Sequence, residues 1–470
     1  MEHIETNKVY YKVIDFIADE IKEGNLKKGE KIPTERELVQ ELKVGRNSIR
    51  EALKILQLTG LITRRQGDGT YINKEFNNFF SEPMVIIFML TKNKGEDVFE
   101  FRNMIEKEVA ILAAQRIDDL GIKALTKVFN KMNIDNDEED RSNYDGMFHY
   151  ELVKSTNNLI IINIYNAMKT ILKLFIGDVR KKALEEISSE EIYEDHKNIY
   201  TAVVNKNSQQ AVEAMIDHIA IMEKYYNQYE FNYKYEGNKV SNLVLEYIVT
   251  EIRKGNLNRG DKVPSERELQ KKLNTSRNSV REIYKSLATI GILEYRSNSG
   301  TYIREDMEDW FNEPVQIIFK LSDITQVDIY EFRKMIETEV AYLAAERITD
   351  EEINELKKYY KLMKNAEEEI EKARYDKMFH YTINKAAKNS IIQYTYNAIT
   401  PMMDLFTYNI RQEVDRNEPE GTVEKLHDNI YKSIIARDKE KSRIYMKEHM
   451  NMIIKYFKVT EPAENKMDSY

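Results

Sequence analysis

Residues 32–38 read IPTEREL, and residues 46–53 read RNSIREAL. In the first stretch Thr34 precedes Glu37 by three residues, which is typical of a capping box at the start of a helix. A short break at 43–45 separates the helix expected over 35–42 from a second one expected over 46–59. Two short helices joined by a tight turn predict a helix-turn-helix.

The flanking residues extend this unit on both sides. An apolar pattern with helical spacing covers residues 9–23 and stops at Gly24. After the second short helix, residues 61–65 and 70–72 surround the glycine turn GDG at 67–69. This order predicts a strand, a tight turn and a second strand. The first 75 residues are therefore expected to form a helix-turn-helix domain with a small β-wing.

The whole pattern returns 231 residues later. VPSEREL occupies 263–269, RNSVREIY occupies 277–284, and GTYI stands at both 69–72 and 300–303. Because the offset stays constant along the chain, the sequence contains two tandem copies of one multi-element protein. The Tyr- and Asn-rich stretch 227–238 is typical of a linker between them.

The rest of each copy shows helical patterns and no strand signals. In the first copy the amphipathic stretches are 98–116, 144–154, 159–182, 189–204 and 211–226. We therefore expect a mainly α protein with two winged helix-turn-helix domains and two all-α helical bundles. The expected winged domains are 1–75 and 231–305, and the expected bundles are 82–230 and 312–460.

The composition excludes several kinds of site. The chain has no Cys, which removes disulfides, thiolate metal sites and thiol catalysis. With 42% hydrophobic and 32% charged residues, it is too apolar for a disordered chain. No apolar stretch approaches the length of a membrane span. We expect a cytoplasmic protein without a membrane partner.

The second helix of a helix-turn-helix enters the DNA major groove with its first residues. Arg can contact guanine in a bidentate way, and Asn and Ser can hydrogen-bond to bases or backbone. The candidate DNA contacts at these positions are Arg46, Asn47, Ser48 and Arg50 in the first copy, and Arg277, Asn278, Ser279 and Arg281 in the second.

An exposed basic helix face without DNA is the alternative to this interpretation. The charge distribution favours DNA binding. Residues 1–73 hold 13 Lys and Arg against 12 Asp and Glu, and residues 232–304 hold 14 against 8. These segments are therefore +1 and +6, although the whole chain is −9. Positive charge is concentrated at the two motifs.

Six of the seven His residues lie at matched positions in the two bundles. An Asp stands four residues before the first His of each set, so the two side chains share one helix face. Three imidazoles and a carboxylate suit a divalent transition metal such as Zn, Ni, Mn or Fe, one ion in each bundle. A single such His could equally be a hydrogen-bonded core residue, but the repetition of the full set favours metal. The candidate ligands are Asp145, His149, His196 and His218, and Asp376, His380, His427 and His449.

The helix-turn-helix segments resemble the GntR family of bacterial transcription regulators. That family shows an L-P-S-E-R-E-L motif, then S-R-x-x-V-R-E-A-L, then G-L-I and a wing ending in G-T-F-V. Both copies match over about 40 positions, with Gly45 where Ser is usual, and Asp68 or Ser299 where Arg is frequent. The resemblance implies a double-stranded DNA operator as partner. It adds Arg36 and Arg267 to the expected DNA contacts, beside the Arg residues named above.

The bundles resemble the FCD effector domain of the FadR-type branch of this family. That domain has an Asp-x-x-x-His pair and two further His as metal ligands, and in relatives the metal binds a small organic acid. The resemblance implies a carboxylate effector, with Arg102 and Arg333 as candidates to bind it. The alternative for Arg102 is an ion pair with Glu106, four residues on.

The leading hypothesis is a transcription regulator and not an enzyme. Its two copies would form a covalent pseudo-dimer that binds a nearly palindromic operator under control of a small carboxylate. The bundles could pair within one chain or between chains. One alternative is a metal-dependent hydrolase that uses the three-His, one-Asp site. Another is a purely structural metal, which would leave DNA binding intact.

Overall fold

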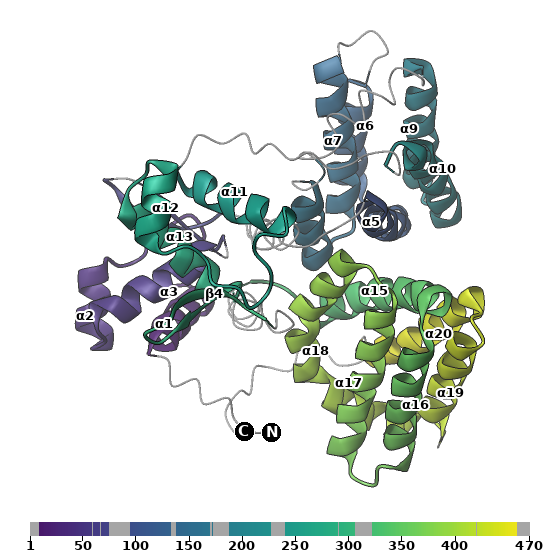
Figure 1. Ribbon diagram of the computed structural model, residues 1–470. Coiled ribbons are helices and arrows are strands. Elements are labelled where there is room, and N and C mark those ends of the chain that lie inside the picture. The colour runs from purple at the N-terminus through teal and green to yellow at the C-terminus, as the bar shows by residue number, and fades with distance from the viewer. Residues whose placement is uncertain are drawn as a thin grey trace. The chain divides into compact units, whose positions relative to one another are not determined.

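The computed structural model describes residues 9–58, 60–65, 67–74, 95–132, 138–169, 172, 188–226, 240–289, 291–305, 322–419 and 421–457. It confirms the mainly helical fold class, with short antiparallel strand pairs as the only sheets among these residues (Figure 1). The chain forms two compact units. One contains both winged domains (1–92, 163–177 and 231–323), and the other contains most of both bundles (93–162, 178–230 and 324–470). The expected linker at 227–238 lies outside the described residues.

Each winged domain has three helices followed by two strands. The first contains α1 (Tyr10–Lys22), α2 (Glu35–Leu42), α3 (Arg46–Leu58), β1 (Ile62–Arg65) and β2 (Gly69–Ile72). The second contains α11 (Val240–Arg253), α12 (Glu266–Leu273), α13 (Arg277–Thr289), β3 (Leu293–Arg296) and β4 (Gly300–Ile303). The strands pair antiparallel in the same register in both copies. The helices, the turn and the wing predicted from the sequence are present in both.

Local hydrogen bonds determine where the helix-turn-helix begins and turns. The Thr34 and Ser265 side chains accept from the backbone of the residue three positions on, and complete capping boxes in α2 and α12. Lys43 and Asn274 then take the left-handed conformation, with φ of 51° and 48°. This conformation ends the helix and turns the chain sharply into α3 or α13.

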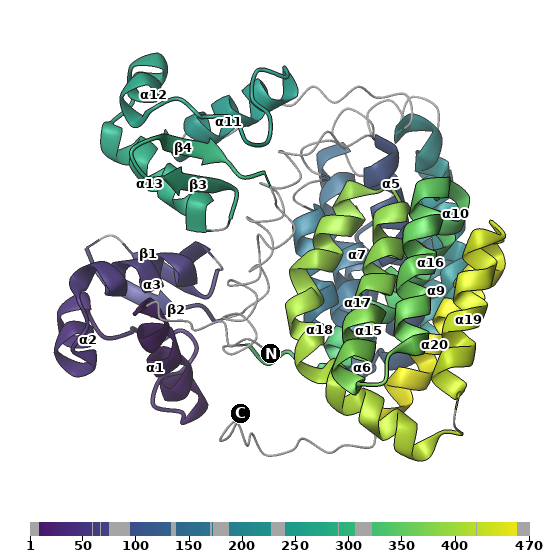
Figure 2. The same ribbon diagram turned by 60° about the horizontal axis from the view of Figure 1, so that its bottom comes forward.

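The bundles contain only helices in their described parts. The first has α5 (Gly95–Arg116), α6 (Asp119–Phe129), α7 (Glu138–Ser155), α9 (Ser189–Val204) and α10 (Ser208–Tyr226), with further helical residues at 159–169. The second has α15 (Gln326–Arg347), α16 (Asp350–Asn365), α17 (Glu369–Ala386), α18 (Ser390–Asn417), α19 (Thr422–Ile435) and α20 (Lys439–Phe457) (Figure 2). The helix predicted over 159–182 is described only in part, but its counterpart α18 is continuous.

The helices α5 and α15 occupy the centre of their bundles. Each is buried on several sides and contacts helices that follow much later in its own copy, α7, α9 and α10 or α17, α19 and α20. Buried residues of α5 include both apolar ones such as Ile105 and the charged pair Arg102 and Glu106. Because burying charged side chains is costly, the buried Arg–Glu pair on this central helix indicates a candidate functional site.

The two bundles contact each other through matched polar side chains. Arg116 forms a two-pronged ion pair with Glu331, and Arg347 does the same with Glu100. Each pair is the other displaced by 231 positions, so the interface is self-complementary, as in a twofold dimer. The Asn158 amide donates to Glu331 at 3.1 Å.

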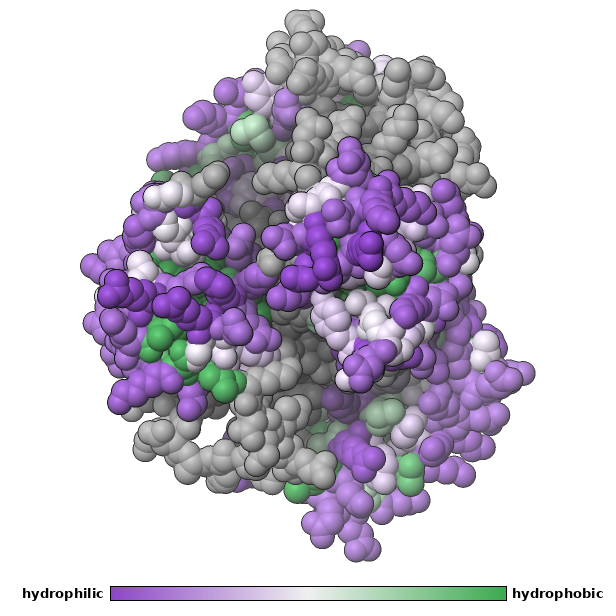
Figure 3. Space-filling view, turned by 60° about the vertical axis from the view of Figure 1, so that its left-hand side comes forward, coloured by the Kyte–Doolittle hydropathy of each residue, from purple (hydrophilic) through white to green (hydrophobic). Residues whose placement is uncertain are grey.

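One face of the molecule shows how the described polar residues are distributed. The face shown in Figure 3 is covered largely by hydrophilic residues, and hydrophobic ones appear in small patches. Of the helices within the described ranges, none has the length and apolar character needed to span a bilayer.

Candidate DNA-binding helices and metal centres

The predicted DNA contacts lie on α2 and α3 and on their counterparts α12 and α13. Their side chains are exposed, except for three that are half-buried, Ser48, Ser279 and Arg281. The exposed set is Arg36, Arg46, Asn47, Arg50, Arg267, Arg277 and Asn278. Both helix-turn-helices therefore present basic and amide groups to solvent at the start of the second helix, where a DNA groove would receive them.

A glutamate on the first helix orients arginines on the second. Arg50 Nε donates to Glu35 Oε2 at 2.9 Å. In the second copy Glu266 binds two arginines, accepting from Arg281 Nη2 at 2.9 Å and from Arg277 Nε at 3.0 Å. The Arg281 hydrogen bond is the main reason that the pKa of Glu266 lies below its usual value. Sequence reasoning missed both glutamates, because their arginines lie 11 or 15 residues further along, across the turn.

The start of the recognition helix differs between the copies. Ser276 Oγ accepts from the Ser279 backbone N–H at 3.0 Å, as an N-cap does. The equivalent residue of the first copy is Gly45, whose carbonyl accepts the Ser48 N–H instead. The second recognition helix therefore has a side-chain cap at a position where the first has none.

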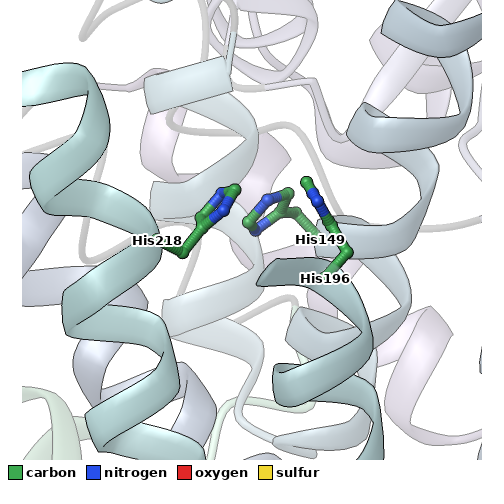
Figure 4. A group of neighbouring side chains, drawn as sticks. All are labelled: His149, His196 and His218. Atoms are coloured by element: carbon green, nitrogen blue, oxygen red, sulfur yellow. The ribbon is translucent and has the colours of Figure 1, made fainter. Parts of the chain in front are cut away.

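Three histidines converge inside each bundle. His149, His196 and His218 come from α7, α9 and α10, and their rings point toward one another (Figure 4). All three are buried, and one ring nitrogen of each lies within 4.8 Å of the others. The same holds for the second set, His380, His427 and His449 on α17, α19 and α20.

The predicted aspartates lie beside these clusters. His196 Nε2 is 3.0 Å from Asp145 Oδ1, and His427 Nε2 is 2.9 Å from Asp376 Oδ1. Each aspartate is therefore close enough to its histidine that the two side chains could bind the same cation. The structure brings together the four residues predicted in each copy.

The ring protons of His196 and His427 are turned away from the cluster. Their Nδ1 atoms lie 2.7 Å from the Ile192 carbonyl and 3.0 Å from the Val423 carbonyl, and donate to them. Their Nε2 atoms are buried and have no hydrogen-bond partner among the described residues. In a metal-binding His, one ring nitrogen usually donates a hydrogen bond to a backbone carbonyl or carboxylate. This bond fixes the tautomer and leaves the lone pair of the other nitrogen available to the metal.

Burial favours the uncharged form of three of these histidines. It lowers the pKa of His149, and it lowers the pKa of His218 and His449 well below the usual value. These imidazoles are therefore neutral at pH 7, which is the form that binds a metal. Because buried nitrogens without partners are costly, the donor set fits a divalent cation better than it fits an apolar core.

Each cluster also lies beside a buried Arg–Glu pair, formed by the arginine that the sequence predicted to bind the effector and a glutamate four residues on. Arg102 Nε donates to Glu106 at 3.1 Å, and Arg333 Nε to Glu337 at 2.5 Å. Glu337 also lies 2.6 Å from His380 Nδ1, whereas Glu106 is 3.9 Å from His149 Nδ1.

The charge state of the second pair follows from its neighbours. Burial opposes ionisation of Glu337, but Arg333 and His380 outweigh it and lower its pKa to about 2. Arg102 and Arg333, the two residues predicted to bind the effector, are both buried on the central helices α5 and α15 beside the histidines.

Two family models match the chain, each of them twice. The model described as bacterial regulatory proteins, gntR family, matches residues 9–72 and 241–303. The FCD domain model matches residues 97–220 and 328–452. The matched ranges contain the winged helices and the two histidine clusters.

Similar proteins span about one copy of the chain. LutR, an HTH-type transcriptional regulator of Bacillus subtilis, is 32% identical over 207 residues, which is 43% of this chain and 94% of LutR. The putative L-lactate dehydrogenase operon regulatory protein of Escherichia coli is 26% identical over 217 residues, 44% of this chain and 84% of that protein. A solved GntR structure from Streptococcus agalactiae is 24% identical with a TM-score of 0.37, and covers 46% of this chain and all of that one.

These relatives are transcription regulators and not enzymes, so the hydrolase alternative is set aside. The chain therefore belongs to the GntR family of bacterial regulatory proteins, as a DNA-binding transcription regulator that carries both the winged helix-turn-helix and the FCD effector domain in two copies.

Proposed function

We propose that the chain binds a nearly palindromic operator as a covalent pseudo-dimer, under control of a small carboxylate held at a metal in each bundle. The observation that carries this proposal is the pair of buried histidine clusters, which repeat residue for residue. The matched ion pairs between the bundles support the pseudo-dimer, because one chain supplies both halves of a twofold interface. The identical residues at the start of α3 and α13 support equal half-sites.

Zn, Ni or Mn fits the donor set of three imidazoles and one carboxylate. The ligands would be Asp145, His149, His196 and His218 in the first bundle, and Asp376, His380, His427 and His449 in the second. When bound, the cation supplies a Lewis-acid position for a carboxylate oxygen. Arg102 and Arg333 would add the positive charge that retains an anion in a buried site.

Calorimetric titration of the full chain, loaded with Zn²⁺, tests the effector. The titrants are small organic acids, including L-lactate because of the operon named for the Escherichia coli relative, and each is paired with its neutral amide. We expect an acid to bind at two sites per chain and its amide not to bind, since only the carboxylate gains from the metal and the Arg. Metal binding without binding of any acid would contradict the effector and leave a structural metal.

The DNA contacts are tested by Arg50→Ala and Arg281→Ala, alone and together. Each removes a groove-facing guanidinium, and we expect each to weaken specific binding by about 1–3 kcal/mol, or about 5- to 150-fold. The double variant is expected to bind the selected duplex no more tightly than it binds a duplex of unrelated sequence. The measurement is a fluorescence anisotropy titration on the duplex that the wild-type chain selects from a random library, with Glu194→Ala in a bundle as the control. Wild-type affinity in both single variants would contradict the assignment.

A further inference from the structure

The two wings share one backbone but carry different charge. The first wing and its flanks, residues 60–74, contain three cations, Arg64, Arg65 and Lys74, against one anion, Asp68. The equivalent residues 291–305 contain two cations against two anions. Since the strand registers coincide, these differences fall at matched positions on the same surface.

One arginine is common to both wings, and its surroundings differ. Arg65 lies over the Tyr71 ring at 4.1 Å, and Arg296 lies over the Tyr302 ring at 4.3 Å. Arg296 Nε also donates to Glu294 at 2.6 Å, and its Nη2 is 3.6 Å from Glu305.

The first wing has Thr63 and Lys74 where the second has these two glutamates. Within the described part of the chain, neither Arg64 nor Arg65 forms an ion pair. Both guanidinium groups are cationic, but two glutamates form ion pairs with Arg296 in the second wing, whereas no carboxylate of the described residues does so with Arg65 in the first.

The single acid of the first wing is already engaged. The Tyr71 hydroxyl donates to Asp68 at 2.8 Å, and Lys31 Nζ is 3.6 Å from the same carboxylate. The Tyr71 hydrogen bond is the largest cause of the lowered pKa of Asp68. This carboxylate is thus held by its own domain and leaves the arginines of β1 exposed to an approaching anion.

The helix-turn-helices differ in the opposite direction. Residues 35–58 contain five cations against four anions, and residues 266–289 contain six against three. Much of the change is on the first helix, where Lys271 and Lys272 replace Gln40 and Glu41. Lys271 is exposed and lies four residues after Arg267, so the two share one face of α12. Lys272 is bound to the Tyr247 hydroxyl at 3.0 Å.

We propose that the two winged domains hold the DNA backbone through different elements, the first mainly through its wing and the second mainly through α12. The residues assigned to phosphate are Arg64 and Arg65 in the first domain and Lys271 in the second. The residues expected to contact bases are identical in both, so the two winged domains would recognise the same base sequence while contacting the phosphates through different elements. This inference rests on the proposed binding of both domains to one DNA.

The test compares matched variants of the full chain on the duplex that the wild type selects from a random library. The variants are Arg65→Gln against Arg296→Gln, and Lys271→Gln against Gln40→Lys. Each of the second two installs the residue that the other copy already has at that position. For each variant the affinity is measured between 50 and 300 mM salt, because each lost phosphate contact reduces the slope of log affinity against log salt by about 0.9.

We expect Arg65→Gln and Lys271→Gln each to reduce the slope by about 0.9, Gln40→Lys to increase it by about the same amount, and Arg296→Gln to change it by less than about 0.3. Equal slopes for Arg65→Gln and Arg296→Gln, or no effect of Lys271→Gln, would overturn the inference while leaving the proposed function intact. A wild-type chain that enriches no duplex would overturn the proposed function itself. Unchanged circular dichroism melting of each variant ensures that the slopes report contacts and not unfolding.

Discussion

Replacing His196 and His427 together with Ala will reduce the metal bound to the purified chain from about two equivalents to below about 0.2. Each substitution removes the nitrogen that lies nearest the aspartate, 3.0 Å from Asp145 or 2.9 Å from Asp376. Two imidazoles and one carboxylate remain in each bundle, which is one ligand short of the four of a closed site. The measurement is elemental analysis after gel filtration in buffer without chelators.

The same variant will unfold at a lower temperature than the metal-bound wild type. A ligand present at 1,000 times its dissociation constant stabilises the folded state by about 4 kcal/mol. For domains of this size, that corresponds to a fall of about 8–16 °C in the melting temperature. Chelation of the wild type with EDTA should produce the same fall, and should change the variant little. His3→Ala, which removes the one histidine outside the bundles, is the matched control.

A wild type that retains no metal, and melts at the same temperature with and without Zn²⁺, would contradict the metal assignment. The six histidines would then be core residues that form their polar contacts with neighbouring carboxylates and backbone carbonyls. Retention of two equivalents by the double variant would show instead that the metal lies elsewhere in the chain. The assignment of DNA binding to the winged domains rests on other observations and would stand after either result.

The sequence predicted the histidine clusters because the duplication repeats their spacing. Asp145 and His149 share a helix face by simple periodicity, and the matched His at 196, 218, 427 and 449 pointed to one site per bundle. Periodicity also predicted the winged domains closely, since capping residues and glycines mark where each element ends.

Other parts of the site had no local signal. Glu106 and Glu337 stand four residues after an arginine, a pattern that is equally common on exposed helices. Only the packing of α5 and α15 in the bundle centre shows that these pairs are buried and face the histidines. Likewise, Glu35 and Glu266 reach their arginines across a turn, and nothing in the spacing indicates that contact.

The contact between bundles was also beyond sequence reasoning, because its partners are 215 and 247 residues apart. Amphipathic patterns show that a helix has a covered face but not what covers it. The tandem arrangement left pairing within one chain and pairing between chains equally open. The ion pairs of Arg116 and Arg347 make this question testable.

Reversing both acids of that contact, Glu100→Arg with Glu331→Arg, will separate the two bundles. The side chains of Glu100 and Glu331 are only 14% and 10% exposed, so each new guanidinium would face Arg347 or Arg116 with little water to screen the repulsion. Breaking a fully buried ion pair costs about 3–5 kcal/mol, and here two partly buried pairs are broken at once. We expect a larger radius of gyration in small-angle X-ray scattering, and a melting transition at lower temperature.

Exchanging the charges on both sides of the contact should bring the bundles together again. Adding Arg116→Glu and Arg347→Glu to the first two substitutions places a glutamate opposite each new arginine. The recovery will be incomplete, because the Asn158 amide donates to Glu331 and would face an arginine in the swapped interface. Glu194→Arg is the control, because Glu194 pairs with Lys197 on the surface of α9, where an ion pair contributes less than about 1 kcal/mol.

Pairing of the bundles within one chain and pairing between chains predict different effects of dilution on the radius and mass of the protein. If they pair within one chain, the radius of the wild type stays constant on dilution, and the charge-reversed chain expands without changing its mass. If they pair between chains, dilution alone separates the wild type, and reversal halves its mass. Because the linked copies meet at an effective concentration set by the chain itself, only the first outcome lets one molecule present two winged domains to one operator at the low concentrations typical of a regulator.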